Sequence, residues 1–172
     1  MSHAQLFDPI TLTLRLGSED ETRALAQKIA PLLTPGDTLL LDGPIGAGKT
    51  FFARTLIQTL QERDGRVEEV PSPTFTLVQT YEVGGVEIWH ADLYRLTSPD
   101  EITELGLEEA FASAICLVEW PNRLDDLTPE NALTLKFRAE PGTEARLVEM
   151  AATSPRWAPL LADLAGWTGG DD

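Results

Sequence analysis

The chain has 172 residues, and its 13 basic residues against 28 acidic ones give a formal net charge of −15 at pH 7. Direct binding of nucleic acid is therefore disfavoured, because contact with phosphates needs a basic surface. With 42% hydrophobic and 24% charged residues, the composition is typical of a folded globular protein and excludes a disordered chain.

The N-terminal part of the chain predicts a strand followed by a capped helix. Residues 10–16 alternate apolar and polar side chains, which is the period of a strand with one buried face. Ser18 is followed three residues later by Glu21, and this pair fits a capping box at the start of a helix. The apolar face of that helix would carry Leu25, Ile29 and either Leu32 or Leu33.

A glycine-rich loop lies between an apolar run and the next predicted helix. After a turn at 35–36, residues 38–41 form an apolar run, as expected of a central strand covered on both faces. The loop itself spans 43–48, and a helix is expected from Lys49 to about Glu62 because apolar residues recur there at helical spacing. This part of the chain is therefore predicted as strand, loop and helix.

The later elements complete an α/β pattern with a mixed sheet, in which central parallel strands gain antiparallel additions and helices flank the sheet. Paired glycines favour a hairpin turn at 83–86, because they accept the positive φ angles that tight turns require. In chain order we expect a loop at 64–73, strands at 74–81 and 87–92, a helix at 99–111, a strand at 114–120, two antiparallel strands at 131–138 and 145–151 joined across Pro141-Gly142, a short helix at 157–164 and a frayed tail at 168–172.

The single cysteine and the N-terminal residues indicate in which cellular compartment the protein is expected. The single cysteine, Cys116, lies in the apolar run 115–118, which predicts a buried, unreactive thiol and a chain suited to a reducing compartment. Residues 1–10 lack a basic segment followed by a long apolar one, and no apolar run approaches the roughly 18 residues of a membrane span. We expect one cytoplasmic domain over 1–172, without membrane association.

The glycine-rich loop fits the pattern GxxxxGK[ST] of nucleotide-binding P-loops, between a strand and a helix. Its glycines allow backbone N–H groups to turn toward phosphates, and the helix N-terminus adds its positive dipole end. Lys49 is predicted to reach the β- and γ-phosphates of ATP, and the Thr50 hydroxyl to ligate Mg²⁺. We therefore expect a P-loop NTPase-like fold whose nucleotide-binding loop comprises Gly43, Pro44, Ile45, Gly46, Ala47, Gly48, Lys49 and Thr50.

Two carboxylates follow predicted strands and are candidates for metal binding and for positioning water. Glu119 ends an apolar strand, which is the arrangement that places a Walker-B carboxylate beside the P-loop threonine. Asp92 ends the preceding strand in the same way, although among 28 acids either residue could simply be a surface carboxylate. His90 precedes Asp92 by two residues on the same face of that strand and could orient it, or could be an ordinary half-buried histidine.

Four segments of the chain occur together and in a fixed order: GPIGAGKT at 43–50, SPTFTLV at 72–78, HADLYRL at 90–96 and CLVEWP at 116–121. In this combination the chain resembles the TsaE (YjeE) family, the ATPase component of bacterial tRNA threonylcarbamoyladenosine synthesis. The resemblance covers about Ser18 to Met150, and the second and third segments are more specific than the P-loop, because generic nucleotide binding does not call for them.

The resemblance also implies roles for individual residues. It makes 72–78 a switch-like segment with Thr74 near the γ-phosphate and Mg²⁺, and it places Asp20 to Thr22 near adenine. Thr50 and Glu119 match the family's Mg²⁺ positions, and Asp92 matches an acid that the family needs for function. The implied catalytic set is Lys49, Thr74, Asp92 and Glu119, the implied metal set is Thr50, Asp92 and Glu119, and Asp20 and Thr22 join the nucleotide-binding set.

Departures from the family pattern occur at two places. Pro44-Ile45 stands where many members carry Asp-Leu, and Pro44 removes one backbone N–H from the loop. After Gly142, where the family often carries arginine, this chain has Thr143, with Arg146 three residues on. Arg146 is thus a candidate for phosphate contact. Trp120 matches a family tryptophan beside the metal-binding glutamate.

Three functions are compatible with the sequence. The first is an ATPase subunit that supports TsaB and TsaD type subunits and meets tRNA only through them. The second is a small-molecule P-loop kinase, which usually needs an arginine-rich lid; the chain offers only isolated arginines at 95, 123, 138 and 146. The third is a nucleotide-gated switch without physiological hydrolysis. ATP is favoured over GTP, because no Asn-Lys-x-Asp segment is present.

Overall fold

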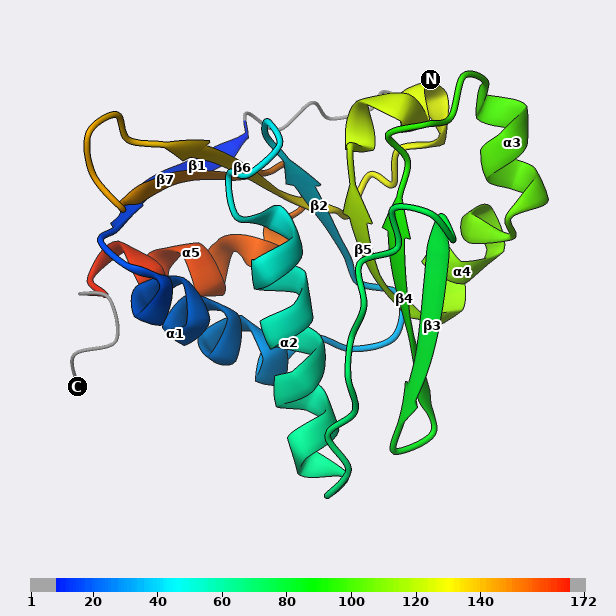
Figure 1. Ribbon diagram of the computed structural model, residues 1–172, viewed down its shortest axis with the longest axis horizontal. Coiled ribbons are helices and arrows are strands. Elements are labelled where there is room, and N and C mark those ends of the chain that lie inside the picture. The colour runs from blue at the N-terminus through cyan, green and yellow to red at the C-terminus, as the bar shows by residue number, and fades with distance from the viewer. Residues whose placement is uncertain (1–8, 168–172) are drawn as a thin grey trace.

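The computed structural model describes residues 9–167, which form a seven-stranded sheet with helices on both faces (Figure 1). The expected tail at 168–172 lies outside the described residues. The strands are β1 (Ile10–Leu16), β2 (Thr38–Asp42), β3 (Val78–Val83), β4 (Val86–Asp92), β5 (Ile115–Glu119), β6 (Leu133–Ala139) and β7 (Arg146–Ala152). The α-helices are α1 (Glu19–Ile29), α2 (Lys49–Arg63), α3 (Pro99–Glu104), α4 (Leu107–Ser113) and α5 (Ala158–Ala165), with 3-10 helices at Ala30–Leu32, Pro121–Leu127 and Pro155–Trp157.

The sheet is mixed, as the sequence predicts, with the order β1-β7-β6-β2-β5-β4-β3. Strand β2 is central and pairs in parallel with both β5 and β6, and β4 pairs in parallel with β5. The pairs β1–β7, β6–β7 and β3–β4 are antiparallel. The parallel centre therefore brings the carboxyl ends of β2, β4 and β5 to one edge of the sheet.

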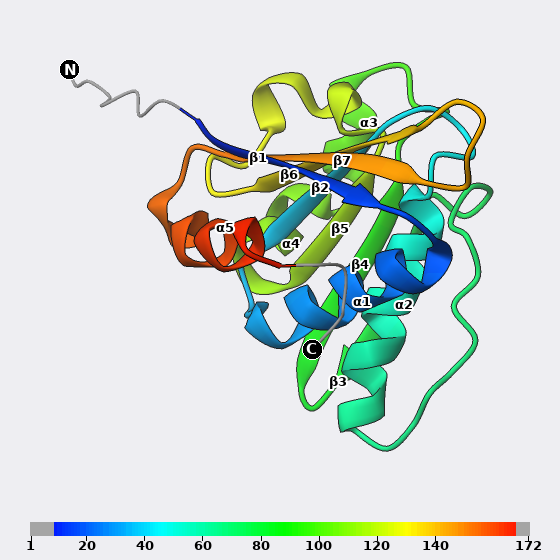
Figure 2. The same cartoon turned by 90° about the vertical axis from the view of Figure 1, so that its left-hand side faces the viewer.

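Two hydrophobic layers enclose the sheet. Leu39 and Leu41 of β2 pack in one core with buried residues of α1, α2 and α5, whereas Leu40, between them, packs in a second core with residues of α3 and α4. Figures 1 and 2 show the corresponding arrangement, with α1, α2 and α5 gathered on one face. This alternation explains why β2 is apolar throughout, since each of its faces is covered.

The capping and hairpin predictions are confirmed with small changes. The Ser18 side chain accepts a hydrogen bond from the Glu21 amide, and the Glu21 carboxylate accepts one from the Gly17 amide. The helix α1 ends at Ile29, so neither Leu32 nor Leu33 belongs to it; Leu33, in extended backbone after the 3-10 helix, is the one that is buried. The hairpin turn at 84–85 uses two glycines with positive φ.

Two predicted boundaries are wrong. The strand expected from Thr74 begins only at Val78, because the Leu77 amide donates to the Pro73 carbonyl at 2.7 Å and Leu77 has φ +71°, so that 73–77 is a turn. The helix expected over 99–111 is divided into α3 and α4 at Gly106, whose φ of +82° interrupts the helical backbone.

Cys116 is fully buried, and burial raises the pKa of its thiol to about 12. Such a thiol stays protonated at neutral pH, in agreement with the predicted unreactive cysteine. Among the described residues, no helix combines the length and the apolar character that a membrane crossing requires.

Candidate active site

The glycine-rich loop connects β2 to α2, and its glycines hold conformations that other residues rarely adopt. Gly43, Gly46 and Gly48 have φ values of +135°, +81° and +111°. A Cβ atom on Gly43 would lie 2.3 Å from the Phe137 carbonyl oxygen, whereas one on Gly46 would meet nothing within 4 Å. The loop therefore approaches β6 so closely that only glycine fits at its first position.

We predict that Gly43→Ala destabilises the protein by about 3 kcal/mol, because the added Cβ collides with backbone and the positive φ adds strain. Gly46→Ala is the matched control in the same loop and should cost about 1 kcal/mol from backbone strain alone. Urea denaturation of the two variants and the parent protein measures the difference. Equal stabilities for the two variants would contradict the close approach.

Backbone N–H groups of this loop are free to bind an anion. The Ala47 amide donates to Pro44 and the Gly43 amide to the Asp42 carboxylate. Within the described part of the chain, the amides of Gly48, Lys49 and Thr50 make no hydrogen bond. These amides lie at the N-terminus of the 15-residue helix α2, where the helix dipole favours negative charge.

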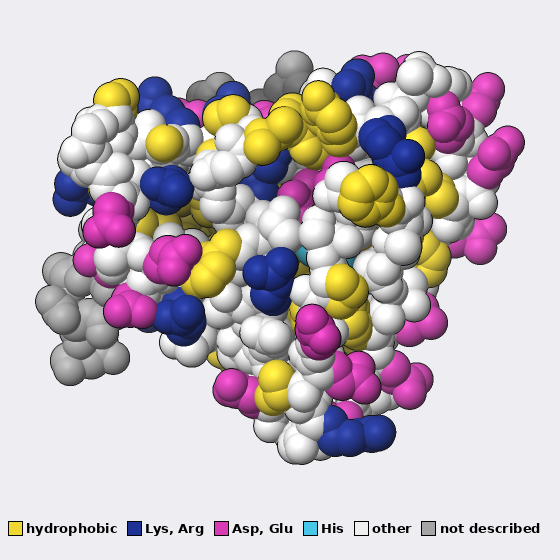
Figure 3. Space-filling model, in the orientation of Figure 1, with side chains coloured by type: hydrophobic (Ala, Val, Ile, Leu, Met, Phe, Trp, Pro, Cys, Tyr) yellow, Lys and Arg dark blue, Asp and Glu magenta, His cyan; other side chains and the backbone are white. Residues whose placement is uncertain are grey.

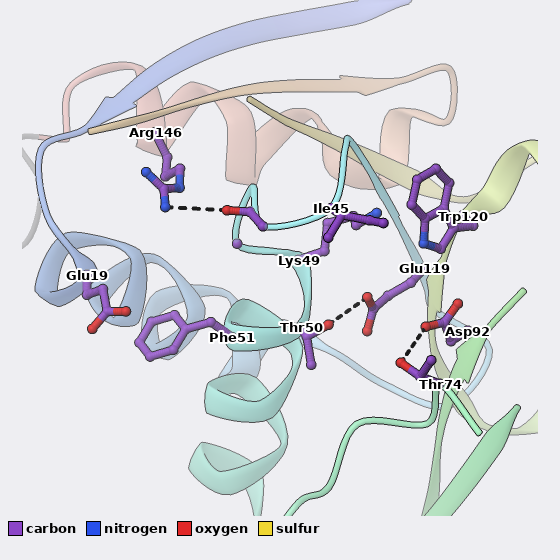
Figure 4. Close-up of a pocket in the computed structure, with 12 residues that line it drawn as sticks. Glu19, Ile45, Lys49, Thr50, Phe51, Thr74, Asp92, Glu119, Trp120 and Arg146 are labelled. Atoms are coloured by element: carbon purple, nitrogen blue, oxygen red, sulfur yellow. Dashed lines mark hydrogen bonds between the residues drawn. The ribbon is translucent and has the colours of Figure 1, made fainter. Parts of the chain in front are cut away.

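The two predicted carboxylates lie next to each other and beside the loop. Asp92 and Glu119 are register partners on the parallel strands β4 and β5, and both are almost fully buried. The Thr50 hydroxyl donates to Oε1 of Glu119 at 2.8 Å, and the Thr74 hydroxyl donates to Oδ2 of Asp92 at 3.2 Å (Figure 4). The structure thus brings together the end of β4, the end of β5, the start of α2 and the turn before β3.

The four side chains line the first of two adjoining hollows, which share Glu19 and Arg146. The hollows have volumes of about 330 and 510 Å³, in the range of small-molecule binding sites. In the space-filling view, basic and acidic side chains lie close together within a depression near the centre of the face (Figure 3). The first hollow is lined by Glu19, Ile45, Gly46, Gly48, Lys49, Thr50, Phe51, Thr74, Asp92, Glu119, Trp120 and Arg146, and the second by Ser18, Glu19, Asp20, Thr143, Glu144 and Arg146.

Lys49 lies inside the first hollow and is almost fully buried. Its ammonium group donates to the Gly43 carbonyl and lies 3.6 Å from the centre of the Trp120 ring. Burial lowers its pKa, and the nearby charges of Glu119, Asp92 and Asp42 oppose that shift. Trp120, which is held at φ +60° and contacts Tyr94 at a ring separation of 4.7 Å, is therefore part of this site.

Neither of the two alternatives for His90 is found, because the residue is fully buried and its hydrogen-bond partner is not Asp92. Nε2 of His90 is 2.7 Å from Oε2 of Glu119. His90 pairs in register with Leu117, so Glu119 is its diagonal neighbour on β5, and the longer glutamate side chain reaches across that diagonal. Asp92 instead accepts hydrogen bonds from Thr74 and from the Tyr94 amide.

The predicted adenine-contact residues differ in position. Asp20 is exposed, forms an ion pair with Arg23 at 2.7 Å and lines the second hollow. Thr22 is buried, donates to the Ser18 carbonyl and lines neither hollow, so the structure does not bring it to the site. Sequence reasoning missed Glu19, which lines both hollows, because an acid in the first turn of a helix is too common to single out.

The candidate Arg146 is brought to the loop by the β6–β7 hairpin. Its Nη2 donates to the Gly46 carbonyl at 3.4 Å, and it lines both hollows. Figure 4 shows it on the side of the loop opposite to Glu119 and Asp92. A cation from β7 and the carboxylates from β4 and β5 therefore flank the same loop.

Arg95 holds the turn that carries Thr74. Its guanidinium donates to the carbonyls of Thr74 at 3.1 Å and Phe75 at 2.8 Å. The Phe75 side chain is nevertheless 86% exposed. This turn is thus anchored by its backbone while it presents an aromatic ring to solvent.

The donor set of the site fits Mg²⁺. No group of three or more His, Cys, Asp or Glu side chains capable of holding a metal occurs in residues 9–167. Mg²⁺ commonly binds one or two protein carboxylates and completes its shell with water and substrate phosphates, rather than being enclosed by protein ligands. The Thr50 hydroxyl and the carboxylates of Glu119 and Asp92 supply oxygen ligands of that kind, beside amides suited to phosphate.

Comparisons with known proteins agree on one family. The model for Threonylcarbamoyl adenosine biosynthesis protein TsaE matches residues 16–148. The tRNA threonylcarbamoyladenosine biosynthesis protein TsaE of Rickettsia conorii is 50% identical over 72% of this chain and 69% of its own length, and that of Bacillus subtilis is 34% identical over 90% and 94%. The crystal structure of Bacillus subtilis YdiB superposes with a TM-score of 0.74 at 29% identity and covers 95% of this chain and 97% of its own.

Proposed function

Because this chain belongs to the TsaE family of threonylcarbamoyladenosine biosynthesis proteins, we propose that it binds ATP with Mg²⁺ and hydrolyses it in support of the subunits that transfer the threonylcarbamoyl group to tRNA. The observation that carries the proposal is the hydrogen bond of 2.8 Å from Thr50 of the phosphate loop to the buried Glu119. It joins a loop suited to binding phosphates to a carboxylate suited to holding a metal, and phosphoryl transfer from a nucleotide requires both.

In this mechanism the loop amides and Lys49 bind the phosphates, and Arg146 approaches them from the other side of the loop. Thr50 and Glu119 would hold Mg²⁺, which supplies charge neutralisation on the β- and γ-phosphate oxygens. Either Asp92 or Glu119 would orient the attacking water, and Thr74, which is hydrogen-bonded to Asp92, would contact the γ-phosphate. The adenine would occupy the second hollow, beside Asp20 and Glu19.

We propose TsaB and TsaD type subunits as partners, and contact with tRNA only through them. The net charge of −15 disfavours direct binding of RNA, and acidic side chains gather over α3 and α4 at one edge of the molecule (Figure 3). By contrast, the exposed apolar side chains include Ile45, which lines the first hollow, and Phe75, which follows the lining residue Thr74 in the chain. A partner protein that covers these side chains would act on the switch-like segment directly. The proposed location is the cytoplasm.

The arginines of this chain argue against a kinase. Arg95 is engaged with the carbonyls of Thr74 and Phe75, and Arg123 donates to the Tyr94 carbonyl at 3.2 Å. Arg146 is the one arginine that lines the two hollows in the described structure. The several free arginines that a lid would use to enclose the phosphates and exclude water are therefore not gathered at this site.

Binding of ATP in MgCl₂ and in EDTA tests the proposal. We predict that EDTA weakens ATP binding at least about tenfold, since the metal contributes several kcal/mol of charge stabilisation. Thr50→Val should lose most of this metal effect because it lacks the hydroxyl, whereas Thr50→Ser, the matched control, should keep it. Isothermal titration calorimetry measures the ATP affinity of the three proteins in MgCl₂ and in EDTA. Equal ATP affinities of the parent protein in MgCl₂ and EDTA would contradict the proposal.

A further inference from the structure

His90 is a fully buried histidine with a single hydrogen-bond partner among the described residues. Its Nε2 atom lies 2.7 Å from Oε2 of Glu119, and its Nδ1 atom has no partner. Because an ionised carboxylate only accepts hydrogen bonds, Nε2 carries the hydrogen and donates it to Glu119. The imidazole therefore directs one donor at the carboxylate that the proposed function assigns to Mg²⁺.

The Glu119 carboxylate is held at both of its oxygens. Oε1 accepts from Thr50 at the start of α2, and Oε2 accepts from His90 on the neighbouring strand β4. Glu119 is only 2% exposed, so an oxygen that lost its donor would gain little from solvent. Asp92 is independent of this arrangement, because its oxygens accept from Thr74 and from the Tyr94 amide.

A role in packing alone does not explain a histidine at this position. A buried side chain that leaves one ring nitrogen without a partner costs stability relative to an apolar residue of similar size. What the protein gains from this histidine is the hydrogen bond to Glu119. Hydrogen-bond donors behind a metal-binding carboxylate set its orientation and thereby its affinity for the metal.

We propose that His90 is a positioning residue, which holds Glu119 in the orientation that serves Mg²⁺ at the nucleotide site. The inference rests on the proposed function and deepens it. Neither the phosphate loop nor the nucleotide itself contacts His90 in this scheme. The consequence is that a change at His90 should alter the metal-dependent part of ATP binding and leave the metal-independent part in place.

The test compares His90→Met with His90→Gln. The two side chains have nearly the same length, but only glutamine places a donor where Nε2 stands. In His90→Met the gain in ATP affinity on adding MgCl₂ should fall about tenfold, and in His90→Gln it should stay within about twofold of the parent protein. ATP affinity in EDTA should be unchanged within about twofold in both variants. Calorimetry measures these affinities, and thermal unfolding checks that each variant folds.

Each outcome decides the matter. A full Mg²⁺ effect in His90→Met, or an equal loss in both variants, would overturn the role of His90 while the proposed function stands. Absence of an Mg²⁺ effect in the parent protein would overturn both. If His90→Met does not fold, His90→Asn replaces it, since its donor is one methylene too short to reach Glu119 and the same loss of about tenfold is expected.

Discussion

Replacing Lys49 with methionine is expected to weaken the binding of ATP with Mg²⁺ by at least about a hundredfold, because loss of a buried cation that pairs with phosphate costs several kcal/mol. Methionine keeps most of the apolar stem of the side chain but removes the ammonium group that lies over the Trp120 ring. Hydrolysis should fall to background, since the charge that develops on the phosphoryl group would lack its nearest protein cation.

Lys136→Met provides the matched control, because Lys136 lies exposed on β6 and lines neither hollow. Both variants lower the positive charge of the protein by one, so a general electrostatic effect would appear in both. Calorimetric titration with ATP and MgCl₂ distinguishes this general effect from a specific loss at Lys49. Similar affinities of the Lys49 and Lys136 variants would refute the assignment of the phosphate loop.

Glu119→Gln is expected to slow ATP hydrolysis by about a hundredfold or more, in the range found when an electrostatic or acid–base group is removed from an active site. Glutamine retains the size of the side chain and an oxygen that can accept from Thr50, but it lacks the negative charge that the proposed Mg²⁺ would need. ATP should still bind through Lys49 and the loop amides. Single-turnover hydrolysis measures the chemical step apart from binding.

The control for this prediction is the variant Glu149→Gln, because Glu149 lies exposed on β7 and lines neither hollow. Hydrolysis at the parental rate in Glu119→Gln would be incompatible with a metal-binding role for Glu119.

Asp92→Asn answers the question that the sequence left open, namely which carboxylate orients the attacking water. If Asp92 does so, its variant should bind ATP with the full Mg²⁺ effect and yet fail to hydrolyse it.

The phosphate loop and its flanking elements could be predicted because their signals are local. Residues 43–50 combine the glycines, the lysine and the threonine in one short segment, and the apolar run before them and the helical spacing after them need no distant contact to be recognised. The antiparallel β6–β7 hairpin was predictable for the same reason. Its parallel pairing with β2 was not, because the order of strands depends on contacts between segments far apart in the chain.

Several features of the site depend on contacts or backbone angles that local sequence patterns do not predict. The partner of His90 could not be predicted from strand periodicity, which places His90 and Asp92 on one face but gives no register between β4 and β5. Arg146 could be named only as a candidate, because it lies 100 residues from Gly46 and its contact with the loop depends on the position of the whole β6–β7 hairpin. The turn at 73–77 was mistaken for a strand because the positive φ of Leu77 has no signature in a non-glycine residue.

We propose that this chain is an ATP hydrolase that acts with threonylcarbamoyl-transfer subunits. The most direct test is the rate of ATP hydrolysis by the purified protein with and without TsaB and TsaD type subunits, with Lys49→Met as the inactive reference. We expect weak hydrolysis alone and stimulation of at least about tenfold by the subunits, as when a partner completes the site of another P-loop protein. A rate that the subunits leave unchanged, or one that Lys49→Met retains in full, would contradict the claim.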